Sequence, residues 1–245
     1  MKSLVCFVSV LAMVSASLLA EDEKTVPATG LANLAAKADV IVLAQVKDTD
    51  YFYRHEYPVN GSAYLKVLIP YKTDKAMDIM EVYESGLHEN ECYFPNPTVF
   101  EEGRRYLLFL QLDPDKPERY RGLPEGCALD VLVDSNNQYA LRYPVTGIDL
   151  TDSLDELARD MTFSDSYALV NENSLSSAER NSLLDAGLIT PFEATEKNAP
   201  RALGMPPAEP PGRQWIYTHG IDLVTVRKML GPAALSPDRN QKSLE

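Results

Sequence analysis

The sequence is poor in the residues from which metal-bound or disulfide-rich domains are built. Its 245 residues include three cysteines, three histidines and one tryptophan, too few for a zinc-finger or multi-metal scaffold. Lysine and arginine number 23 against 36 aspartates and glutamates, so the formal net charge is −13. Nucleic acid is therefore not an expected partner, because neutralising phosphates requires clustered basic side chains.

Long apolar runs are missing beyond the first twenty residues. Those residues begin with a positive Lys2, continue with an apolar stretch over 4–14 and end in small residues over 16–20. This layout predicts a secretory signal peptide, of bacterial type, cleaved after Ala20, with an uncleaved anchor as the alternative. No other run approaches the roughly 20 apolar residues that cross a bilayer. We therefore expect an acidic, periplasmic or secreted protein without a transmembrane segment after cleavage.

Sequence motifs for catalysis and cofactor binding are also missing. Gly-x-Ser-x-Gly, Ser-x-x-Lys and His-Glu-x-x-His do not occur, although each supports a known catalytic geometry. The 12 glycines do not cluster into a phosphate-binding loop. The sequence therefore predicts no catalytic residue, no metal site and no cofactor.

Cleavage of the signal peptide would leave two cysteines, Cys92 and Cys127. An even pair in an oxidising compartment favours a disulfide, which would stabilise the fold by roughly 4 kcal/mol through chain entropy. A pair of metal-binding or catalytic thiols is the alternative. A metal ion could then bind the His88–Cys92 stretch, and a calcium ion could bind the carboxylates around Asp113 and Asp115.

The first half of the mature chain reads as a series of short strands after one helix. The helix is expected over residues 29–37. Apolar or alternating runs predict the strands, over residues 39–46, 62–71, 78–83, 105–112, 129–133 and 138–145. Such a series is typical of an antiparallel barrel or sandwich. The expected fold class is therefore mainly β, within α+β.

The pattern changes after Gly147. Helices are expected over residues 152–160, with Asp152 as the cap, over 178–186 and over 223–230. Five prolines between residues 200 and 212 predict a stiff linker. The predicted organisation is a signal peptide (1–20), an N-terminal arm (21–29), a barrel (30–147), a helical extension (148–199), a Pro-rich linker (200–213) and a C-terminal helix with a tail (214–245).

Three segments together resemble a known family. They are the helix and strand ending in ADVIVLAQV at residues 38–46, the stretch FEEGRRYLLFL at residues 100–110, and the flanking Cys92 and Cys127. They are similar to the netrin-like, tissue-inhibitor-of-metalloproteinases type of OB barrel. Over residues 30–147, this resemblance implies a five-stranded barrel with a protein-binding or inhibitory role. The inhibitors chelate zinc through an N-terminal cysteine, but the mature terminus predicted here is Glu21, so that mechanism is not implied.

Aromatic and basic side chains gather between the first two predicted strands, and we take them as the candidate binding surface: Tyr51, Tyr53, Arg54, His55 and Tyr57. Tyrosine and arginine are common binding anchors. Alternatively, these rings cover one end of the barrel. The expected function is an exported, non-enzymatic module that binds a protein or an envelope component. The alternatives are a peptidase inhibitor that works without an N-terminal cysteine and a hydrolase with an unrecognised site.

Overall fold

A computed structural model describes residues 29–55, 57–85, 92, 99–192 and 213–232. The predicted signal peptide, most of the N-terminal arm, nearly all of the Pro-rich linker and the tail from residue 233 lie outside these ranges. The helices are α1 (Leu31–Lys37), α2 (Ser177–Asp185) and α3 (Leu223–Met229). The strands are β1 (Val40–Arg54), β2 (Tyr57–Lys72), β3 (Ile79–Glu84), β4 (Arg105–Leu112), β5 (Tyr120–Gly122), β6 (Ala128–Val133), β7 (Tyr139–Tyr143), β8 (Arg159–Asp160), β9 (Leu169–Asn171), β10 (Ile189–Phe192), β11 (Gln214–Tyr217) and β12 (His219–Asp222).

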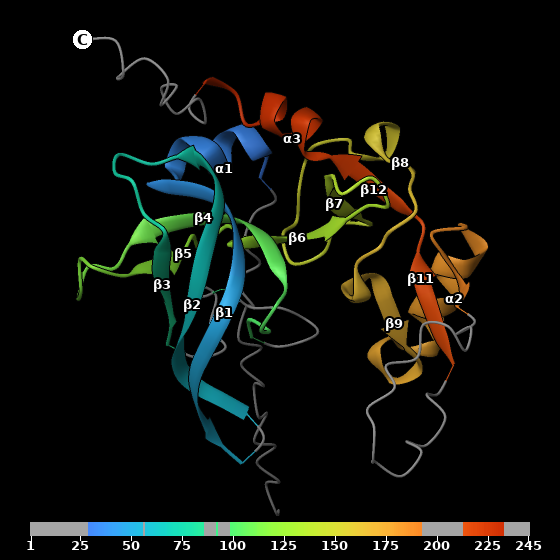
Figure 1. Ribbon diagram of the computed structural model, residues 1–245, viewed down its shortest axis with the longest axis horizontal. Coiled ribbons are helices and arrows are strands. Elements are labelled where there is room, and N and C mark those ends of the chain that lie inside the picture. The colour runs from blue at the N-terminus through green and yellow to red at the C-terminus, as the bar shows by residue number, and fades with distance from the viewer. Residues whose placement is uncertain (1–28, 56, 86–91, 93–98, 193–212, 233–245) are drawn as a thin grey trace, which may run out of the picture.

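The first five strands close into a barrel (Figure 1). Their order is β1-β2-β3-β5-β4, and β4 pairs back onto β1. All neighbours are antiparallel except β3 and β5, which run parallel and share one residue pair, Val82 and Tyr120. The predicted fold class is thus confirmed: the chain is mainly β, with a small OB-like barrel and a leading helix.

β1 and β4 are buried on both faces, which explains their nearly continuous apolar sequences. One face points into the barrel, where side chains from all five strands form a cluster that includes Val42, Val82 and Leu108. The other face carries Ile41 and Phe109 and packs beneath α1 and α3. The two helices therefore cover the outside of the barrel wall that these strands form.

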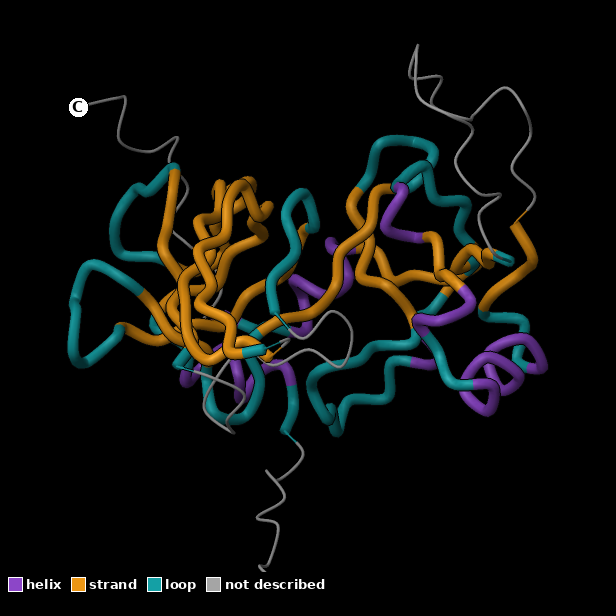
Figure 2. Tube along the Cα trace, turned by 90° about the horizontal axis from the view of Figure 1, so that it is seen from below, coloured by secondary structure: helices purple, strands orange, loops and turns teal. Residues whose placement is uncertain are grey.

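The barrel wall continues into the C-terminal half because β4 shares one edge between two partners. Leu110–Leu112 pair with β5, whereas Arg105–Leu108 pair with β6. From β6 the sheet extends through β7 and β12 to β8, and β10, β11 and β9 form a second sheet beside it. Figure 2 shows the barrel strands and the C-terminal strands as two groups side by side.

Side chains from distant parts of the chain close both ends of α1. The Asp152 carboxylate accepts a hydrogen bond from the Leu31 backbone N–H at 2.7 Å, which satisfies a free donor of the first turn. At the other end, the Lys72 ammonium on β2 donates to the Ala35 carbonyl oxygen at 2.9 Å. The leading helix is therefore tied to both the barrel and the C-terminal half.

Two of the three helices expected after Gly147 are confirmed. α2 begins at the predicted capping box, in which the Glu179 N–H donates to the Ser176 hydroxyl at 3.2 Å and the Ser176 N–H donates to the Glu179 carboxylate at 2.9 Å. α3 follows β12. The helix expected over residues 152–160 is wrong. A short 3-10 helix at Asp155–Leu157 and strand β8 stand there, because the aspartate expected to cap that helix caps α1 instead.

The predicted cysteine pair is confirmed as a disulfide between Cys92 and Cys127, which are 35 residues apart. Gly122 on β5 lies against it, since a Cβ atom at this glycine would be 2.9 Å from the Cys92 sulfur and 2.8 Å from the Cys127 Cβ. The disulfide therefore fastens the loop after β3 to the start of β6, next to the short strand that closes the barrel.

Replacing both cysteines, Cys92→Ala with Cys127→Ala, should lower the free energy of unfolding by about 4 kcal/mol, because the unfolded chain regains the entropy of the closed loop. Denaturant unfolding of the oxidised protein and of the double variant measures the difference. Reducing the wild type should lower its stability by a similar amount. A loss below about 1 kcal/mol would contradict this assignment of the loop constraint.

Candidate functional site

The β1–β2 hairpin continues past the barrel as a two-stranded projection. β1 pairs with β4 over residues 40–45 only, whereas its pairing with β2 runs on to Arg54 opposite Tyr57. In Figure 1 the projection points to the bottom of the view, away from α1 and α3 at the top. His55 forms the turn in the left-handed region, at a φ of 59°. The candidate binding residues predicted from the sequence therefore lie along one hairpin.

These five residues divide into two groups. Tyr53 is 48% exposed, and Arg54 and His55 are also exposed. Tyr57 stands opposite Arg54 at the first position of β2, and its side chain lies outside the described part of the chain. Tyr51 is only half-exposed and packs against the core inside the barrel. The apex thus presents Tyr53, Arg54 and His55, whereas Tyr51 belongs to the base.

Tyr51 braces the projection against the barrel. Its hydroxyl is buried, and its ring lies so close over β2 that a Cβ atom at Gly61 would be 2.5 Å from a ring carbon. Burial, followed by the negative charge of Glu84, raises the pKa of the Tyr51 phenol. Of the two roles considered for these rings, covering the barrel is therefore the one that applies to Tyr51.

Phe52 and Val59 complete the exposed apex, and the sequence analysis missed both. Phe52 is 64% exposed and Val59 is 37% exposed. The pairing of β1 with β2 shifts register between Phe52 and Tyr53, and such a bulge redirects the side chains that follow it. Two consecutive aromatic residues consequently both reach solvent. Strict strand alternation would have assigned Phe52 and Tyr53 to opposite faces, which makes the bulge hard to foresee.

A cleft of about 830 Å³ forms the second candidate site, between the barrel wall and the C-terminal sheet. One side consists of residues from β4, β6 and β7, and the other of residues from β9, β11, α2 and the short helices before them. The lining side chains include Arg104, Asp130, Arg142, Tyr167, Leu175, Leu183 and Tyr217. These residues are widely separated in the chain and form no local motif, so the sequence analysis did not identify the cleft.

Two arginines converge on one carboxylate in the cleft. Asp130 lies 3.1 Å from the Nε of Arg142 and 3.5 Å from an Nη of Arg104. Arg142 also donates to the Tyr217 hydroxyl at 2.7 Å, and Arg104 stacks over the Tyr167 ring at 5.2 Å. Burial disfavours the charged form of Arg104, but the Asp130 charge and other neighbours outweigh this and raise its pKa. Both guanidiniums are therefore fixed as cations.

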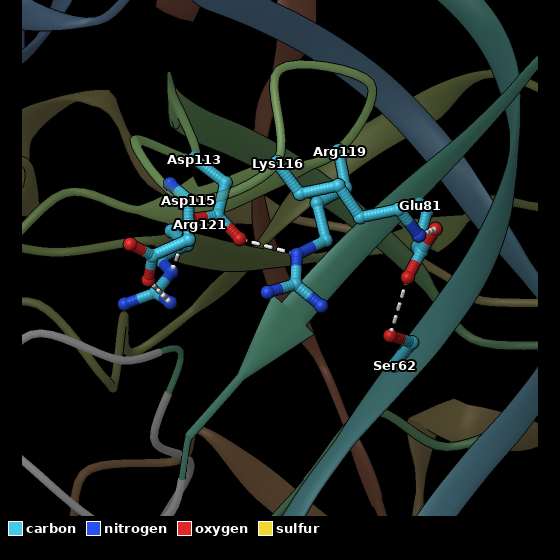
Figure 3. A network of polar contacts seen from close by, with 7 residues as sticks. All are labelled: Ser62, Glu81, Asp113, Asp115, Lys116, Arg119 and Arg121. Atoms are coloured by element: carbon cyan, nitrogen blue, oxygen red, sulfur yellow. Dashed lines mark hydrogen bonds and ion pairs between the residues drawn. The ribbon is translucent and has the colours of Figure 1, made fainter.

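A third polar group lies where β3 meets β5, the parallel seam of the barrel (Figure 3). Asp113 is 1% exposed and pairs with Arg119 and with the Nε of Arg121 at 3.0 Å. The Arg119 guanidinium lies over the Tyr83 ring of β3, 3.7 Å from its centroid. Lys116 adds a contact of 3.4 Å to Glu81 on the same strand. The network therefore holds the seam together.

The acidic turn considered for calcium has a structural role. Arg119 and Arg121 neutralise the Asp113 carboxylate, and the Asp115 N–H donates to it at 3.0 Å. In the described ranges, no group of three His, Cys, Asp or Glu side chains is arranged to hold a metal ion. Most of the other metal candidate, the His88–Cys92 stretch, falls outside those ranges.

Comparison with known proteins gives no match to any family model, curated protein or solved structure. The resemblance to netrin-like and metalloproteinase-inhibitor domains therefore stays a prediction. Among the helices of the described residues, none has the length and apolar character needed to cross a membrane. Function has to follow from the side chains at the hairpin apex and in the cleft.

Asp113→Asn should make the protein less stable at neutral pH and change its response to acid. Burial alone would raise the pKa of Asp113, but the Asp115 N–H and the two arginines outweigh it and hold this pKa below 3.8. The carboxylate therefore stabilises the fold above that pH, and its contribution is lost as the pH falls through the lowered pKa. The expected loss at pH 7 is about 2 kcal/mol, from charge-assisted hydrogen bonds.

Urea unfolding from pH 7 down to pH 2 measures this effect, and the two proteins should converge at the acidic end. Asp115→Asn is the matched control, because the Asp115 side chain is 75% exposed and its replacement should change stability by less than about 0.5 kcal/mol. A difference between wild type and Asp113→Asn that stays constant with pH would contradict the assignment.

Proposed function

We propose that the protein is an exported, non-enzymatic binding module that recognises a partner protein through the apex of the β1–β2 hairpin. The observation that carries this proposal is the exposure of two adjacent aromatic rings, Phe52 at 64% and Tyr53 at 48%, at the end of a rigid projection. Arg54 and His55 complete the apex and are also exposed. A narrow convex surface of this kind fits a concave apolar pocket, and the guanidinium favours carboxylates around the rim of that pocket.

The rigidity of the hairpin supports a binding role. The strands stay paired from the barrel to the turn, and Tyr51 packs its ring against the barrel core. A partner would therefore have to immobilise few additional torsions, which lowers the entropic cost of association. Tyrosine and arginine are also enriched among the residues that dominate binding energies.

The architecture supports the same interpretation. In OB barrels, the loop between the first two strands is one of the two that commonly bind ligands, and here that loop is the turn of the projecting hairpin. The predicted signal peptide and the disulfide between Cys92 and Cys127 are consistent with export to an oxidising compartment, periplasmic or extracellular. The netrin-like resemblance, if real, would add a precedent for protein binding by such a barrel.

Affinity capture from an envelope extract tests the proposal, with the oxidised chain 21–245 as bait. The double variant Phe52→Ser with Tyr53→Ser should lose the partner that the wild type holds, with at least about a tenfold drop in recovery. Val224→Ser on α3 is the matched control, because this side chain is 68% exposed and lies at the opposite end of the molecule (Figure 1).

Thermal unfolding should show that all three baits are equally stable, since the substituted side chains are exposed. A partner retained equally by the double variant would contradict recognition at the apex. Failure of folded wild-type bait to hold any protein would contradict the binding function itself.

A further inference from the structure

The cleft between the barrel and the C-terminal sheet has a locally cationic floor, in a chain whose net charge is −13. Arg104 and Arg142 share the single carboxylate of Asp130, so these three side chains together carry one positive charge. The other acidic residues of the cleft lie further out. Glu101 is 47% exposed at the rim, and the carboxylate of Glu179 is exposed and bonded to the Ser176 N–H.

The two arginines are held to different degrees. Arg142 donates to Tyr217 and Thr146 and lies 3.1 Å from Asp130, so its guanidinium is fixed in place. Arg104 has a looser contact of 3.5 Å with Asp130, and its Nε is paired at 2.5 Å with the exposed Glu101. Exposed ion pairs of this kind contribute little energy. A carboxylate entering the cleft could therefore replace Glu101 at Arg104 at small cost.

The rest of the cleft suits an apolar chain. Its other walls carry apolar side chains from β7, β9 and α2 and from the turn before α2: Pro144, Leu169, Val170, Leu175, Ala178 and Leu183. A volume of about 830 Å³ is ample for a ligand of several hundred daltons. All three residues of β9 line the cleft, and β9 is the edge strand of its sheet within the described residues. An extended peptide could pair with such an edge.

We propose that this cleft binds a carboxylate joined to an apolar chain, with Arg104 receiving the carboxylate in place of Glu101. Two sources share this chemistry: the C-terminus of a polypeptide that ends in an apolar residue, and a fatty acid. The edge of β9 gives the polypeptide a main-chain partner that a fatty acid cannot use. The site is separate from the hairpin apex and does not depend on the function proposed for it.

Isothermal titration calorimetry on the full oxidised chain 21–245 tests the proposal with three probes. These are an N-acetylated pentapeptide that ends in valyl-leucine with a free carboxylate, the same peptide with a C-terminal amide, and decanoate. The free-acid peptide should bind at least about tenfold more tightly than the amide, because the amide cannot form the charge-assisted pair with the guanidinium.

Two variants in the cleft should change the affinity in opposite directions. Arg104→Gln should weaken binding of the free acid about tenfold, whereas Glu101→Gln should strengthen it about threefold by removing the competing carboxylate. A purely structural role for this ion pair would not produce the gain. The matched controls, Arg159→Gln and Glu156→Gln, replace exposed residues outside the cleft and should leave the affinity unchanged.

Each outcome of the titrations decides a point. Binding of decanoate but not of the peptide, with the same dependence on Arg104, would support the proposed chemistry and assign the source as a fatty acid. Equal affinities for acid and amide, no response to either cleft variant, or failure of both carboxylates to bind would overturn the proposal. The variant Phe52→Ser with Tyr53→Ser should bind these probes as the wild type does, which separates this test from that of the hairpin.

Discussion

Closure of the barrel between β3 and β5 is the constraint on which the other features depend. The backbone contributes one parallel residue pair there, Val82 with Tyr120, and side chains supply the rest of the connection. Arg119 joins the buried Asp113 to the Tyr83 ring, and the disulfide lies against β5 from the other side. Because a buried ion pair is costly to break by removing one partner, this seam resists opening, and the closed barrel keeps β1 and β2 paired beyond its end.

β4 transmits the same rigidity to the C-terminal half. Its shared edge makes β6 a continuation of the barrel wall, and β12 from near the end of the chain joins that wall through β7. The hairpin apex and the cleft are therefore two surfaces of one framework. The apex is convex and aromatic, whereas the cleft is concave, with paired charges at its floor. They suit different ligands, and neither uses the residues that hold the seam.

The sequence predicts the elements with strong local signals. The doubly buried strands β1 and β4, the hairpin of β6 with β7 and the capping box of α2 all match the structure. The helix expected over residues 152–160 failed because Asp152 caps a helix 121 residues away, a long-range contact with no local signature. The cleft was missed for the same reason, since it joins Arg104 to Asp130 and Arg142. The hairpin aromatics were found, but only a bulge, which local patterns do not reveal, separates Tyr53 from Tyr51.

Direct contact at the apex can be measured by site-specific photo-crosslinking in cells that produce the full chain. A photoreactive benzoyl-phenylalanine replaces Phe52 in one experiment and Val224 in the other, because both side chains are exposed but lie at opposite ends of the molecule (Figure 1). The account predicts a discrete crosslinked protein from position 52 and none from position 224. The same adducts from both positions, or no adduct from position 52, would contradict recognition of a partner protein by the hairpin.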